Sequence, residues 1–175
     1  MEPHQIIEAC SKAPVSVRKE IAKLLKLDVV ETIEDKLMNF GTIARSKSIP
    51  LYYDTPSGTD PDIIKLLPNA IVSTSPTPQG KWKNADALLN GTTEEEMLET
   101  AVKMSLFHAI DTFTNMITTF VIQTHREIFI KETDTDGNHF KLVCSLYAGE
   151  GLRLYLDEFN PSGWSGAGCA WLQQQ

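Results

Sequence analysis

The side chains best suited to acid, base or nucleophilic chemistry are four histidines and three cysteines, spread along a chain of 175 residues. They are His4, His108, His125 and His139, together with Cys10, Cys144 and Cys169. A cysteine nucleophile needs a nearby base that raises its thiolate fraction, and that base can be distant in sequence. Cys144 lies in an alternating pattern typical of a buried strand residue, whereas Cys169 lies in a Gly-rich tail. Cys169 is therefore the better candidate for a reactive thiol.

One histidine has a carboxylate at helical spacing. His108 and Asp111 are three residues apart in a segment with helical periodicity, so their side chains can share one helix face. The carboxylate could orient the imidazole for proton transfer. A surface pair or a hydrogen-bonded structural histidine is the more common use of this spacing, and the sequence leaves both interpretations open.

Metal and cofactor motifs are missing from the sequence. No Cys-x-x-Cys or His-Glu-x-x-His spacing occurs. Residues 134–138 resemble part of a calcium loop, but its twelfth position would be Val143, which cannot supply the bidentate carboxylate required there. A hairpin turn at Asp136-Gly137 explains this segment better. We therefore expect no metal ion and no cofactor.

The longest patterned stretch, residues 92–159, must position most of these side chains. Thr92 and Thr93 precede three glutamates, which is typical of a helix N-terminus where hydroxyls cap N–H groups and acids oppose the helix dipole. Apolar residues then recur at helical spacing; they are Leu98, Val102, Leu106, Ile110, Phe113, Ile117 and Phe120. This pattern predicts one long helix, although the β-branched run 116–124 would also suit a strand.

Three stretches that follow have the period of a β-strand. They cover residues 128–130, 140–147 and 152–156. Asp136-Gly137 divides the first two and Gly149-Glu-Gly151 divides the last two, which predicts hairpins. We expect the long central helix to pack on this small antiparallel β-meander. The facing residues should be Val102, Leu106, Ile110 and Phe113 on the helix, with Leu142, Leu146, Leu154 and Leu156 on the strands.

Residues 1–46 carry helical patterns and complete an α+β fold. We expect a short helix within residues 4–12, a second from Pro14, and a third that Asp28 and Glu31 open and Gly41 stops. Helices this short cannot bury their apolar faces alone, so they should pack on the core. The chain is therefore expected to form a single domain, residues 1–175.

Two segments outside the helix and meander of 92–159 carry aromatic residues. Residues 47–91 are rich in Pro and Gly, with helical turns expected at 62–67 and a short strand at 70–73, and should wrap the core as an arm. Residues 160–175 form a Gly-rich tail with two tryptophans. Tyr and Trp are enriched in protein interfaces. The expected binding surface comprises Tyr52, Tyr53, Trp82, Trp164 and Trp171.

Composition narrows the class of protein. The chain is 42% hydrophobic and 22% charged, as in ordinary globular domains. Its net charge of −7 argues against nucleic acid as a partner, because phosphates attract basic side chains. No apolar run reaches the roughly 20 residues of a membrane-spanning helix. With no leader sequence and an odd number of widely spaced cysteines, a cytoplasmic protein with free thiols is expected.

Because no complete catalytic constellation is visible, the sequence favours a non-enzymatic accessory or structural protein that binds a protein partner or forms a homo-oligomer. Two alternatives stay open. One is a small hydrolase or transferase that uses Cys169 or the His108–Asp111 pair. The other is a carrier that holds an apolar small molecule between the helix and the meander.

Overall fold

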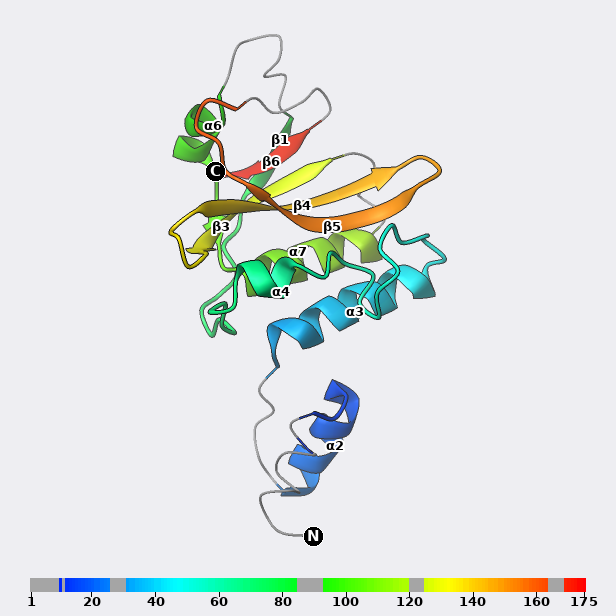
Figure 1. Cartoon of the computed structure of the whole chain (residues 1–175). Helices are drawn as coiled ribbons and strands as arrows, with labels where there is room; N and C mark the ends of the chain where they lie inside the picture. Colours follow the sequence, from blue (N-terminus) through cyan, green and yellow to red (C-terminus); the bar gives the residue numbers. More distant parts are fainter. Residues whose placement is uncertain (1–9, 11, 26–30, 85–92, 120–124, 164–168) are drawn as a thin grey trace.

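Helix α7 lies against one face of a six-stranded β-sheet, and α3 packs against α7, in the computed structural model of the chain (Figure 1). The structure describes residues 10, 12–25, 31–84, 93–119, 125–163 and 169–175. The helices are α2 (Val15–Leu25), α3 (Ile33–Ser46), α4 (Ile63–Leu66), α6 (Glu94–Thr100) and α7 (Leu106–Thr118). The strands are β1 (Lys81–Asn84), β2 (Lys103–Met104), β3 (Arg126–Thr133), β4 (His139–Tyr147), β5 (Gly151–Glu158) and β6 (Ala170–Gln173). The predicted α+β class is confirmed.

The sheet is mixed, with the strand order β1-β6-β3-β4-β5. Strands β3, β4 and β5 form the predicted antiparallel meander, in which Leu142 lies opposite both Ile128 and Leu156. On the other side of β3, β6 pairs in parallel and is followed by antiparallel β1, while β2 also pairs in parallel with β3. The meander is thus only part of the sheet, because the C-terminal tail supplies β6 between β1 and β3.

The prediction of one long helix was wrong, because α6 and α7 are separate helices with β2 between them. Ser105 starts α7 as its N-cap, and its side-chain oxygen accepts the N–H of His108 at 3.3 Å. Val102 donates its N–H to the carbonyl of Leu172 in β6, at 2.8 Å, rather than to a helical partner. The helical spacing of apolar residues continues across the break because α6, β2 and α7 each contribute buried apolar side chains to the interior. Residues 116–118 are helical, and residues 120–124 lie outside the described residues.

Helix α3 begins and ends later than predicted. Thr32 is its N-cap: the side chain accepts the N–H of Asp35 at 3.2 Å, and the Asp35 carboxylate accepts the N–H of Thr32 at 2.8 Å. Asp28, the predicted cap, lies outside the described residues, as does most of the predicted helix 4–12. Gly41 does not stop the helix. A Cβ there would lie 1.9 Å from the carbonyl oxygen of Ser57, so glycine is needed for close packing.

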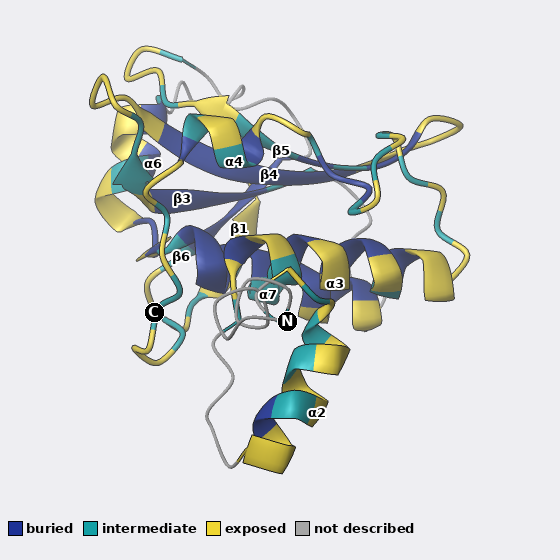
Figure 2. Cartoon of the chain, turned by 60° about the horizontal axis from the view of Figure 1, so that its bottom comes forward, coloured by how far each residue is buried: buried dark blue, intermediate teal, exposed yellow. Residues whose placement is uncertain are grey.

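The main core lies between α7 and the sheet, and Figure 2 shows the buried side of α7. The residues buried there as predicted are Val102, Leu106, Ile110, Phe113, Leu142 and Leu154. Leu156 is only partly buried against this core. Leu146 is 40% exposed, so its predicted burial was wrong. It lies near the end of β4, in a hairpin that extends past the end of α7 (Figure 1).

The segment after α3 follows the opposite edge of the sheet from β1. Leu51 forms a parallel bridge with Leu152 of β5, and the Tyr52 N–H donates to the Leu152 carbonyl at 3.0 Å. The helical turns predicted at 62–67 are present as α4, whereas the strand predicted at 70–73 is not formed. Both sheet edges are thus bordered by residues from the 47–91 segment.

Candidate functional site

The sheet face opposite α7 carries a buried ion-pair cluster. Lys141, the third residue of β4, points to this face because successive strand side chains alternate. Its ammonium lies 3.6 Å from Glu127 of β3 and 3.4 Å from Asp157 of β5, and it also pairs with Glu94 of α6. The side chains of Lys141, Glu94 and Glu127 are all less than a tenth exposed. A lysine and two carboxylates therefore share a site almost without solvent.

Helix α6 covers this face and delivers Glu94. Thr93 caps the helix: its hydroxyl oxygen accepts the N–H of Glu96 at 3.3 Å, and the Glu96 carboxylate accepts the N–H of Thr93 at 2.7 Å. Glu94 instead turns to the sheet, where it also accepts the N–H of Asn160 at 3.0 Å. The glutamates at the start of α6 therefore differ in role: Glu96 caps the helix, whereas Glu94 neutralises the buried Lys141.

His125, Glu127, Ser145 and Cys169 meet at the beginning of β3; we call them the His–Glu–Cys cluster. His125 Nε2 lies 3.0 Å from Glu127 Oε1, and His125 Nδ1 lies 2.9 Å from Ser145 Oγ. The ligand atoms of His125, Glu127 and Cys169 all lie within 4.8 Å of one another. Glu127, Ser145 and Cys169 are buried, whereas the His125 side chain is 28% exposed. The fold therefore unites Cys169 with a histidine from another part of the chain.

Nearby charges keep Glu127 ionised. Burial alone raises the pKa of this carboxyl group, but the hydrogen bond from His125, the charge of Lys141 and a hydrogen bond from Cys169 outweigh burial and lower its pKa. When the imidazole is neutral and its proton is on Nε2, the ionised Glu127 accepts this Nε2–H and Nδ1 accepts the Ser145 hydroxyl proton. This order of bonds, from Ser145 through His125 to Glu127, is the order of an acid–base relay. Cys169 and Ser145 are only 3% and 2% exposed, which restricts access of a substrate.

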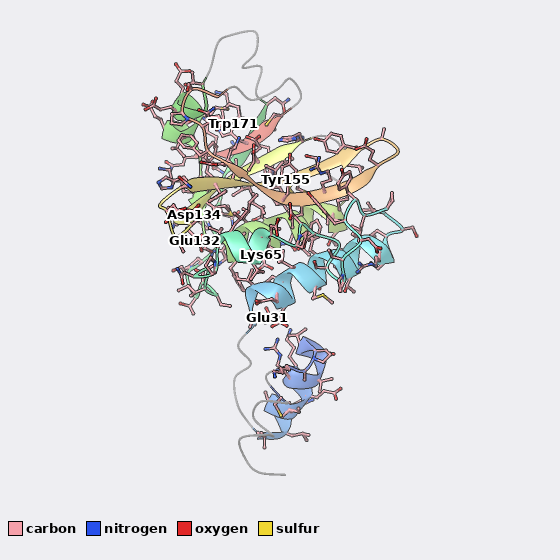
Figure 3. The ribbon with its side chains drawn as sticks, in the orientation of Figure 1. Glu31, Lys65, Glu132, Asp134, Tyr155 and Trp171 are labelled. Carbon is pink, nitrogen blue, oxygen red and sulfur yellow. The ribbon has the colours of Figure 1, made fainter. Side chains whose placement is uncertain are left out.

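A second group of side chains lies beside this cluster, and we call it the tyrosine–arginine surface. Its members are Tyr52, Tyr53, Tyr147, Arg153 and Tyr155. The Arg153 guanidinium carbon lies 4.4 Å from the ring centre of Tyr52 and 4.6 Å from that of Tyr155, which is labelled in Figure 3. The rings of Tyr147 and Tyr53 are 5.7 Å and 5.9 Å away. One arginine is therefore surrounded by four tyrosines.

Two of the tyrosines in this surface are open to solvent. Tyr52 is 44% and Tyr147 is 39% exposed. Arg153 Nη2 donates to the Tyr53 hydroxyl at 3.4 Å, but within the described part of the chain Arg153 Nε is buried with no acceptor. Burial and the neighbouring Tyr147 raise the pKa of Tyr155 to about 12, so this hydroxyl stays protonated at neutral pH. The surface thus combines flat aromatic area with a fixed positive charge.

The residues of the predicted binding surface are distributed over three places. Tyr52 and Tyr53 lie in the tyrosine–arginine surface, with their rings 5.1 Å apart. Trp82 stacks on Phe113 at 6.1 Å and lines a cleft of about 420 Å³ beside α7. Trp171 is buried, 5% exposed, and Trp164 lies outside the described residues. The predicted residues therefore do not form one patch among the residues described.

The His108–Asp111 pair is used structurally. His108 is 6% exposed and packs edge-on against the Phe107 ring, with 5.6 Å between ring centres. Asp111 forms an ion pair with Lys36 of α3 at 3.0 Å. Cys144 is fully buried, and burial raises the pKa of its thiol, which leaves it unreactive.

Comparisons with protein-family models, with curated proteins and with solved structures give no match. Among the described residues, no helix has both the length and the apolar character needed to cross a membrane. The function therefore has to be inferred from the chemistry of the two groups of side chains described above.

Proposed function

We propose that this chain is a non-enzymatic protein that binds another protein, or a second copy of itself, through the tyrosine–arginine surface. The observation that carries the proposal is the packing of Arg153 among four tyrosine rings, two of which are more than a third exposed. Tyrosine and arginine are enriched among the residues that dominate binding energies. Tyrosine supplies a large contact area with few rotatable bonds.

The surface is organised before a partner arrives. A cation above an aromatic ring is attracted to the ring face, so the rings hold the Arg153 guanidinium in one place. Side chains already held in this way lose less conformational entropy on binding. We expect the partner to place a carboxylate next to the Arg153 guanidinium, since interactions with a charged donor are strong.

The test compares the full chain with Tyr147→Ala and Arg153→Ala, using affinity capture from a native lysate and solution mass by light scattering. We expect each variant to bind its partner, or itself, at least roughly thirtyfold more weakly, which corresponds to about 2 kcal/mol. Ile71→Ala is the matched control because Ile71 is 72% exposed and does not belong to this surface. If both surface variants keep every captured protein and the same solution mass, the proposal is wrong.

A second candidate function is a thiol-dependent hydrolase or transferase, and the meeting of Cys169 with His125 and Glu127 favours it. The histidine is near enough to act as a base, and the carboxylate can orient it. Burial of Cys169 at 3% exposure opposes this function. Hydrolysis of activated esters by the wild type, lost in Cys169→Ser and retained in Cys10→Ser, would support the enzyme over the binding protein.

A further inference from the structure

We propose that His125, Glu127 and Cys169 form a binding site for one divalent transition-metal ion of the zinc class. The ligand atoms are an imidazole nitrogen, a carboxylate oxygen and a thiol sulfur, and all lie within 4.8 Å of one another. The sequence predicts no metal because none of the known short spacings occurs. His125 and Glu127 lie two residues apart at the beginning of β3, and the parallel pairing of β6 with β3 brings Cys169 to them.

The ligand types select the ion. Thiolate and imidazole together favour zinc, cobalt and related ions over magnesium or calcium, which prefer oxygen ligands. Ligand atoms around a tetrahedral zinc ion are roughly 3.3–3.7 Å apart, given bond lengths of about 2.0–2.3 Å. The present separations reach 4.8 Å, so binding requires the ligands to move inward by about 1 Å. Three protein ligands leave the fourth position to water.

Ser145 can support the histidine in both states. Without metal, the Ser145 hydroxyl donates to Nδ1 of His125, and Nε2–H donates to Glu127. With metal, the ring proton moves from Nε2 to Nδ1 and is donated to Ser145 Oγ, so that the Nε2 lone pair can bind the ion. Metal-binding histidines commonly donate their second ring N–H in this way. The imidazole loses no proton overall, and the proton released to solvent is that of the Cys169 thiol.

The charge around the site also suits a cation. The Lys141 ammonium lies 3.6 Å from the Glu127 carboxylate, and by itself this ammonium would repel a cation. Lys141 is shared, however, with Glu94 and Asp157. The Lys141 cluster carries a net charge of −2, while Arg126, whose guanidinium donates to the His125 carbonyl at 3.2 Å, and Arg153, opposite Ser145 in β5, add positive charge near the site. The Cys169 thiolate formed on binding and the Glu127 carboxylate together balance the charge of a divalent ion.

The test is cobalt titration of the full, untagged, reduced and metal-free chain, followed by absorption spectroscopy. We expect saturation at one equivalent, ligand-field bands of a tetrahedral ion and a thiolate-to-cobalt charge-transfer band, all removed by added zinc. Cys169→Ser should lose the charge-transfer band. His125→Ala and Ser145→Ala should each weaken binding at least about tenfold. Cys10→Ser and the exposed His139→Ala are matched controls and should titrate like the wild type.

The proposal is overturned by the absence of a saturable charge-transfer band in the wild type, or by a band that survives Cys169→Ser. If Cys169→Ser does not fold, His125→Ala decides the question, because His125 is the most exposed of the three ligands. Undiminished cobalt affinity in that variant would place the metal elsewhere. Partner capture in the absence of added metal tests the tyrosine–arginine surface separately.

Discussion

Ser145 of β4 lies directly opposite Arg153 of β5 in the antiparallel register. Ser145 contacts His125 in the His–Glu–Cys cluster, whereas Arg153 is the centre of the tyrosine–arginine surface. The two groups are therefore neighbours on one face of the sheet, joined by one cross-strand residue pair. Variants at either group should be measured for both partner capture and cobalt binding.

Replacement of Lys141 by Met should destabilise the protein strongly. The change leaves the buried carboxylates of Glu94 and Glu127 without their common positive partner, which costs about 3–5 kcal/mol in unfolding free energy. Urea denaturation measures this loss. Lys65→Met is the matched control, because Lys65 pairs with Asp62 at the exposed surface and its loss should change the stability little. Equal, small losses in both variants would contradict a buried ion-pair cluster.

The acid dependence of stability should report on Glu127. Its pKa in the folded protein is below the ordinary value of 4.5, so its contribution to stability is complete above pH 4.5 and is lost as the pH falls below that value. Glu127→Gln should be less stable than the wild type at pH 7, and this difference should shrink between pH 4.5 and pH 3. Denaturation at several pH values checks this. A difference that stays constant down to pH 3 would contradict the lowered pKa.

Replacement of Ile110 by Asp should unfold the protein or cost at least about 4 kcal/mol, because Ile110 is fully buried and the new charge would have no partner. Leu146→Asp is the matched control. Because Leu146 is 40% exposed, the melting temperature of this variant should differ little from that of the wild type. Thermal denaturation followed by circular dichroism measures both. An Ile110→Asp protein that melts like the wild type would refute the packing of α7 on the sheet.

Calcium should not bind the loop between β3 and β4. Asp134 Oδ1 accepts the N–H groups of Asp136 and Asn138, each at 2.9 Å, so its carboxylate is already used to form the turn. Val143, which would be the twelfth loop residue, is buried in β4 and has no oxygen ligand to offer. Titration calorimetry with millimolar calcium should give only heats of dilution. A saturable signal that Asp136→Asn removes would show the opposite.

Deletion of residues 170–175 should prevent stable folding. These residues include β6, which lies between β1 and β3, and they contribute the buried Trp171 and Leu172. The deletion therefore exposes apolar surface and removes the pairing partner of β1. Solubility and melting temperature measure the effect. A soluble truncated protein with an unchanged melting temperature would mean that the tail is not part of the sheet.

Features that depend on local sequence were predicted well. The hairpins at Asp136-Gly137 and Gly149-Glu-Gly151 follow from turn chemistry, and Gly137, Gly149 and Gly151 all have the positive φ that such turns require. The break before α7 was missed although Ser105 offered a cap signal, because the apolar spacing alone continues through it. The spacing of apolar residues alone does not distinguish one continuous helix from two helices that pack on the same core.

Features that depend on distant pairing could not be predicted. Lys141 is an outward-facing polar residue by strand alternation, and only the packing of α6 on the second face buries it beside Glu94. His125 and Cys169 carry no joint signal, since their contact arises from the pairing of β3 with β6. Arg153 and Tyr155, in contrast, are two apart in a predicted strand, so their shared face could have been recognised from alternation.

The position of β6 also determines the order in which the sheet can assemble. The hairpins of β3, β4 and β5 join residues close in sequence, so they can close early at low entropic cost. Strand β1 is made much earlier by the ribosome, but its only strand partner in the described sheet is β6. We therefore expect β1, with Trp82 packed on Phe113, to join the sheet only after the C-terminal strand β6 has paired with β3.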